Sequence, residues 1–137
     1  MADISKTLAN VTMGEEGIQF TIGQAGAAVS QGEPVYLSTS DGKYYKTDAN
    51  DGVAKAAAVG IALLPAATNG YLIIQTAGLI NLGATLVTGT SYYVSTTAGG
   101  ICLESDLSSG HFTTFLGIAT STSLLELDIV VGGVARA

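Results

Sequence analysis

Charged residues are scarce in this chain of 137 residues: only 12% are Asp, Glu, Lys or Arg, and just five are Lys or Arg. Soluble domains average about 25% charged residues, so an unusually small part of this surface carries charge. The basic residues form no run, and the net charge is −6. A surface that follows phosphates needs clustered Lys and Arg, so we expect no nucleic-acid partner.

Cysteine and histidine each occur once, as Cys102 and His111. A single cysteine excludes a disulfide framework, and we interpret Cys102 as a buried thiol at the apolar end of a strand. His111 could be combined with Asp106 and a serine into a triad, or with Cys102 into a dyad. No serine stands in a Gly-x-Ser-x-Gly motif, however, so we predict no catalytic residue and no enzymatic activity.

Motifs for cofactors and metals are also missing. Asp48-Ala49-Asn50-Asp51-Gly52 begins like a calcium loop, but its glycine is fifth rather than sixth and Val59 occupies the place of the last ligand, so we interpret it as a polar turn. An adventitious cation remains the alternative there. Gly83 and Gly89 are one residue too far apart for a phosphate loop, and Thr90 replaces its lysine. We therefore expect no cofactor and no bound metal.

Long apolar runs are absent as well. The longest, residues 56–67, contains Gly60 and Pro65 and falls short of the roughly 20 residues that a membrane span requires. The segment from Met1 to Met13 lacks the continuous apolar stretch of a signal peptide. We expect synthesis in the cytoplasm and no membrane partner.

What the chain does have is 18 glycines, 47% hydrophobic residues and an internal duplication. Gly26-Ala27-Ala28-Val29-Ser30-Gln31-Gly32 matches Gly83-Ala84-Thr85-Leu86-Val87-Thr88-Gly89, and the same offset superposes Val59-Gly60-Ile61-Ala62 on Leu116-Gly117-Ile118-Ala119. If two residues are removed from the following turn, residues 71–78 continue the match on residues 126–133. We predict an N-terminal arm with the first strand at 1–21 and one β domain at 22–137, built from related units at about 22–79 and 80–137.

Short runs rich in Val, Ile, Thr, Tyr and Phe, separated by Gly, Asn, Asp and Ser, predict many short strands. Asp41-Gly42 and Asn69-Gly70 are typical of tight turns. We expect an all-β fold, a compact barrel or sandwich with an extended N-terminal arm and at most one helical turn, near residues 50–56. The predicted strands are 18–22, 34–39, 43–47, 56–63, 71–76, 91–95, 100–103, 112–120 and 124–131.

Tyr44-Tyr45 and Tyr92-Tyr93 allow two interpretations. Exposed rings would form a stacking platform for a sugar. Because adjacent side chains of a strand point to opposite faces, however, one ring of each pair would turn inward, so structural packing is the preferred interpretation.

The order of the motifs resembles small virion proteins of tailed bacteriophages, of the capsid cement or decoration type. The resemblance rests on Gly-Ala-x-(Val/Leu)-x-x-Gly, then Val35-Tyr36-Leu37, Asp41-Gly42-Lys43, Val59-Gly60-Ile61-Ala62 and Ile74-Gln75-Thr76-Ala77-Gly78, with Tyr92-Tyr93-Val94-Ser95 in the second unit. It covers nearly everything after Ile22, although these motifs are degenerate patterns of glycine and apolar residues.

The resemblance implies a homo-oligomer, commonly a trimer, that is made in the host cytoplasm, binds the major capsid protein on the exterior of the virion and clamps neighbouring subunits. The N-terminal residues outside the duplication are the candidate capsid contacts, and we single out Ile4, Leu8 and Val11 for their helix-like spacing. Deleting residues 2–17 would then abolish attachment but leave the β body folded. A frayed terminus without a role is the alternative.

The rival function is a phage fibre, tail or receptor-binding module that contacts a cell-surface glycan. Loss of saturable glycan binding on substitution of Tyr44 or Tyr92 would identify it.

Overall fold

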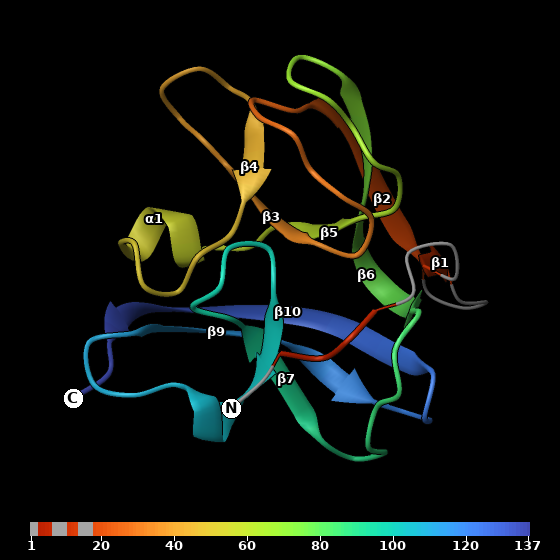
Figure 1. Cartoon of the computed structure of the whole chain (residues 1–137), viewed down its shortest axis with the longest axis vertical. Helices are drawn as coiled ribbons and strands as arrows, with labels where there is room; N and C mark the ends of the chain where they lie inside the picture. Colours follow the sequence, from red (N-terminus) through yellow and green to blue (C-terminus); the bar gives the residue numbers. More distant parts are fainter. Residues whose placement is uncertain (1–2, 7–10, 14–17) are drawn as a thin grey trace.

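Antiparallel strands make up most of the regular structure in the computed structural model, which describes residues 3–6, 11–13 and 18–137. One curled sheet forms a half-barrel (Figure 1), with the strand order β4-β3-β5-β6-β10-β9-β7-β8 and with β1 and β2 paired to β6. The strands are β1 (Val11–Met13), β2 (Gln19–Gln24), β3 (Pro34–Leu37), β4 (Tyr44–Lys46), β5 (Gly60–Ala62), β6 (Tyr71–Leu82), β7 (Ser91–Val94), β8 (Ile101–Leu103), β9 (Phe112–Ala119) and β10 (Leu124–Ala135). The helical turns are α1 (Val53–Ala56) and the 3₁₀ turn η2 (Glu104–Asp106).

The predicted all-β fold is confirmed, and each of the nine predicted strands corresponds to an observed one. The least accurate prediction is the strand at 56–63, because only Gly60–Ala62 is extended and α1 precedes it. Val-Ala-Lys-Ala favours a helical turn, as alanine and lysine have high helix propensity. That turn lies within the region 50–56 where the sequence allows one.

The two halves of the sheet have the same strand order. The offset that aligns Gly26 with Gly83 also superposes the start of β3 on the start of β7, and the start of β4 on the start of β8. In the first half β6 pairs with β2 and β5, and in the second half its other end pairs with β1 and β10. The boundary between residues 79 and 80 therefore lies inside β6, which runs through both halves (Figure 1).

One detail of the duplication differs from the sequence alignment. Ile61 of β5 stands opposite Gln75 of β6, and its equivalent Ile118 of β9 stands opposite Glu126 of β10. The alignment of residues 71–78 with 126–133 would instead make Val130 the equivalent of Gln75. The reason is the loop after β9, residues 120–123, which is shorter than the loop after β5, residues 63–70. The two registers differ by an even number of positions, so each side chain keeps its face of the sheet.

Gly60 and Gly117 are equivalent positions that let strands approach closely. A Cβ atom on Gly60 would collide with the carbonyl of Gln75, and one on Gly117 would collide with the carbonyl of Glu126. The repeated motif (Val/Leu)-Gly-Ile-Ala therefore contains glycine for steric reasons, while its isoleucine in the first half, Ile61, is fully buried.

The hydrophobic core is formed by two clusters. The larger one occupies the second half and the contact between the halves, and it includes Ile80, Leu82, Leu116 and Leu125. The smaller one lies within the first half, around Leu72 and Ile74 of β6. In the part of the chain that the structure describes, no helix has the length and apolar character needed to cross a membrane.

Candidate interaction surface

Two of the three predicted N-terminal contact residues, Ile4 and Val11, lie along the body of the protein. Ile4 packs against the larger core cluster, and its amide donates a hydrogen bond to the carbonyl of Ile101 in β8 at 3.1 Å. Val11 begins β1 and stands opposite Leu82 of β6. Leu8 lies outside the described residues. In this structure Ile4 thus contributes to the chain's own core.

Polar side chains on either side of Ile4 anchor the same segment. Ser95 Oγ donates to Asp3 Oδ1 at 2.6 Å, and Lys6 Nζ donates to the Gly32 carbonyl at 2.8 Å. Burial lowers the pKa of Lys6, and the nearby carboxylates of Glu33 and Asp3 oppose this effect. Because Gly32 and Ser95 belong to different halves, residues 3–6 connect the halves, and we expect their deletion to weaken the β body.

A strongly exposed apolar surface lies on β2 and the adjoining end of β6. Phe20, Ile22 and Tyr71 are 58%, 65% and 76% exposed. Phe20, Ile22 and Gln24 are two positions apart on β2 and so lie on the same face, and Gln24 stands opposite Tyr71. Residues two apart on paired strands share a face, so Phe20, Ile22 and Tyr71 form one surface, here called the β2–β6 face.

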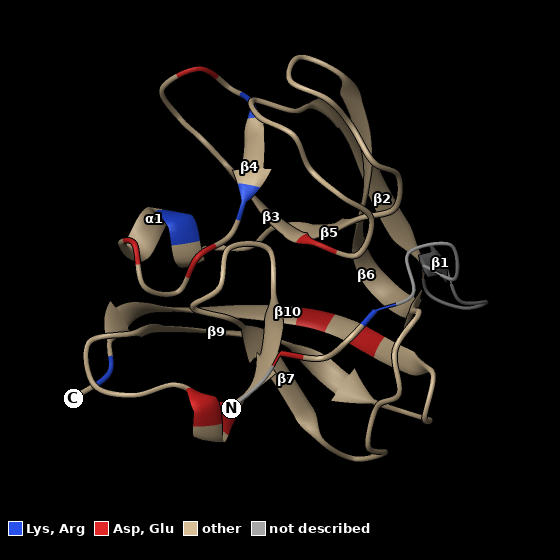
Figure 2. Ribbon diagram, in the orientation of Figure 1, with Lys and Arg blue, Asp and Glu red and all other residues tan. Residues whose placement is uncertain are grey.

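No charged residue occurs in either strand of this face. Figure 2 shows β2 and β6 without any acidic or basic colour, whereas charged residues mark β4, α1 and β10. Exposed apolar surface of this kind is typical of contacts with another protein. These residues are not among those that the sequence singles out, although the alternation Phe20-Thr21-Ile22 beside an uncharged β6 is a signal that could identify them.

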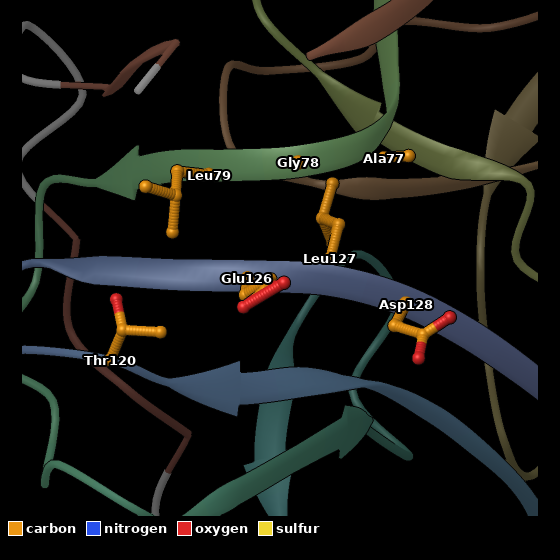
Figure 3. Close-up of a pocket in the computed structure, with 7 residues that line it drawn as sticks. All are labelled: Ala77, Gly78, Leu79, Thr120, Glu126, Leu127 and Asp128. Carbon is orange, nitrogen blue, oxygen red and sulfur yellow. The ribbon is translucent and has the colours of Figure 1, made fainter. Parts of the chain in front are cut away.

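A groove of about 510 Å³ opens where β6 and β10 separate (Figure 3). Their pairing ends at Leu127 and Gly78, and Gly78 has a φ of 92° that favours glycine. The groove is lined by Ala77, Gly78, Leu79, Thr120, Glu126, Leu127 and Asp128. Its charged groups are the carboxylates of Glu126 and Asp128 on β10, and its lining contains neither a histidine nor a cysteine.

The residues considered for catalysis have local structural roles. His111 Nδ1 accepts a hydrogen bond from the Ser108 amide at 3.0 Å, and Asp106 Oδ2 accepts one from the Leu103 amide at 3.1 Å. Cys102 is buried, and burial raises the pKa of its thiol to about 12. A thiol in this state is a poor nucleophile at neutral pH.

The polar turn at residues 48–52 is organised by its own side chains. Asp48 Oδ1 accepts a hydrogen bond from the Asn50 amide at 2.9 Å, and Asp51 forms an ion pair with Lys55 at 2.6 Å. Within residues 3–6, 11–13 and 18–137, no three His, Cys, Asp or Glu side chains gather where they could hold a metal ion.

The paired tyrosines are mostly engaged in packing. Tyr92 is 2% exposed, and Tyr93 meets Phe115 edge to face with 5.8 Å between ring centroids. Tyr44 packs against the smaller core cluster, and Tyr45 stacks on Tyr36. Tyr44 and Tyr92 therefore do not form an open platform for a sugar ring.

Comparison with known proteins gives no relative: no protein-family model matches the chain, and no curated protein matches it.

Proposed function

We propose that this chain is a non-enzymatic structural protein of a tailed-phage virion, which binds the outer surface of the capsid and clamps neighbouring major capsid subunits. The sequence motifs that resemble capsid cement proteins support this proposal. The observation that carries it is the β2–β6 face, which exposes three large apolar side chains and has no charge on its two strands.

The β2–β6 face is the contact surface in this proposal, in place of the N-terminal residues. Complete burial of a large apolar side chain contributes about 1.5–3 kcal/mol. Phe20, Ile22 and Tyr71 still expose more than half of their surface, so most of that free energy is gained only when a partner covers them. Ile4, in contrast, already packs against the chain's own core.

Stabilisation of the shell follows from binding. A protein that binds only the assembled, expanded lattice stabilises that lattice in proportion to its occupancy. No reaction and no cofactor are needed. The net charge of −6 suits the capsid exterior better than an interior packed with DNA.

The test uses expanded capsids of the phage that encodes the chain, prepared without this protein. After addition of the purified chain, we expect saturable co-sedimentation with the capsids and a higher temperature of shell disruption. Unexpanded procapsids are the matched control and should bind less. Absence of co-sedimentation with both particles at micromolar concentration would refute the proposal.

A further inference from the structure

One face of the second half is open, whereas the equivalent face of the first half is covered. Ile61 and Gln75 stand opposite one another on β5 and β6, and both are fully buried. Their equivalents on β9 and β10 are Ile118 and Glu126, which also stand opposite one another. Ile118 is 44% exposed, and Glu126 is exposed as well. A face that the chain covers in one half is therefore uncovered in the other.

Cross-strand pairs and a shared cavity show which side chains belong to this open face. Phe115 of β9 stands opposite Val130 of β10, and directly opposed side chains of paired strands lie on the same side. Phe115, Ile118, Glu126 and Asp128 together line a cavity of about 170 Å³. Phe115, Ile118, Glu126, Asp128 and Val130 are here called the β9–β10 face.

The charge on this face is negative. Glu126 and Asp128 line both the small cavity and the larger groove beside it. They are the acidic positions of β10 in Figure 2, and in the described part of the chain neither forms an ion pair. The covered face of the first half has the neutral Gln75 in place of Glu126. An uncharged partner would bury these carboxylates without a counter-charge, which is strongly unfavourable.

We propose that the β9–β10 face binds a segment of another protein that presents an arginine between apolar side chains. The guanidinium would lie between the carboxylates of Glu126 and Asp128, because its five N–H donors can bind both. Its flat surface suits the ring of Phe115, which lines the same cavity. The apolar neighbours of the arginine would cover Ile118 and Val130, which are 44% and 58% exposed.

A second copy of this chain does not supply such an arginine. Arg136 is its one arginine, and Arg136 Nη2 donates to Glu104 Oε1 at 2.7 Å. Three of the four lysines also bind groups of their own chain: Lys6, Lys43 and Lys55. The partner is therefore a different protein. The inference goes beyond the proposed function, which assigns capsid binding to the β2–β6 face, and it does not depend on that binding.

The first experiment titrates the isotope-labelled full chain with the end-blocked peptide Thr-Val-Arg-Val-Thr and follows the backbone amide shifts by NMR at low salt. We expect saturable shifts in β9 and β10 around the β9–β10 face. The same peptide with citrulline in place of arginine keeps the shape without the charge, and it should bind about tenfold more weakly. Absence of saturable shifts at about 10 mM peptide, or equal binding of the citrulline peptide, would overturn the proposal.

The second experiment repeats the titration with the variant Glu126→Gln/Asp128→Asn, which should bind the arginine peptide about tenfold more weakly than the wild type. This variant should stay folded, because both side chains are exposed. Asp51→Asn/Glu104→Gln removes the same charge elsewhere and should bind like the wild type. If the two double variants bind equally, the peptide responds only to the net charge of the chain, and the assigned site is wrong.

A dilution series without peptide separates a second copy from a different partner. We expect the amide shifts of β9 and β10 to stay constant between about 10 μM and about 1 mM chain. Concentration-dependent shifts confined to the β9–β10 face would mean that another copy of the chain occupies it, and would overturn the proposal.

Discussion

The amide of Ile4 donates a hydrogen bond to the carbonyl of Ile101 in β8 at 3.1 Å. In the first half of the sheet, a different segment of the chain donates the equivalent hydrogen bond. Tyr44, which begins β4, is the equivalent of Ile101 in the first half, and its carbonyl accepts a hydrogen bond from the Gly26 amide at 2.9 Å. The first half therefore covers its edge strand β4 with the chain that follows β2. The second half covers β8 with residues near the N-terminus, which are thus part of the fold.

Ile4→Ala should lower the free energy of unfolding by about 1–2 kcal/mol, less than for a fully buried isoleucine because Ile4 is only partly buried. Chemical denaturation monitored by circular dichroism measures this change. Val87→Ala, at an exposed position, is the control and should change the value by less than about 0.5 kcal/mol. Equal stability of Ile4→Ala and the wild type would show that residues 3–6 are not needed for the fold.

Gly60→Ala and Gly117→Ala should each destabilise the protein by about 1–3 kcal/mol or more, since a methyl group at either position collides with the backbone of the neighbouring strand. The melting temperature of each variant checks this. Gly110→Ala is the comparison, because its Cβ would meet nothing within 4 Å and only its φ of 87° is unfavourable. If Gly117→Ala melts no lower than Gly110→Ala, β9 and β10 do not approach so closely at this position.

Cys102 should make stability depend on pH in alkaline solution. Its folded pKa of about 12 lies above the ordinary value of 9.0, so the folded state favours the neutral thiol. The resulting stabilisation is complete below about pH 9 and is lost as the pH rises toward 12. We expect the difference in unfolding free energy between wild type and Cys102→Ala to shrink across that range. A constant difference would mean that the thiol ionises equally easily in both states.

Much of the fold follows from the sequence, because turn residues and β-branched runs are local signals. Asp41-Gly42 and Asn69-Gly70 are found at tight turns, where Gly42 and Asn69 have φ values of 72° and 68°. The strand predicted at 71–76 is too short, since β6 continues through Gly78 to Leu82. A glycine with positive φ usually ends a strand, but here the pairing of β6 with β10 and β1 extends it.

The candidate surface is harder to predict, because exposure depends on tertiary packing. Phe20 and Ile22 have the composition of core residues, and only the position of β2 at the margin of the sheet leaves them open. Ile4 is the opposite case. Its position outside the duplication suggests a free arm, but Ile4 forms a hydrogen bond with β8 and packs against the larger core cluster. The periodicity of the sequence does not show that, among the described residues, β2 has no strand beside its outer edge, nor that Ile4 lies beside β8.

The central claim is that the β2–β6 face binds the capsid, and quantitative co-sedimentation with expanded capsids tests it most directly. The variant Phe20→Ser/Ile22→Ser/Tyr71→Ser should remain folded, because all three side chains are more than half exposed, and should lose binding by about 100-fold or more. Leu64→Ser/Val87→Ser changes exposed apolar residues elsewhere and should bind like the wild type. Undiminished binding of the folded triple variant would contradict the account.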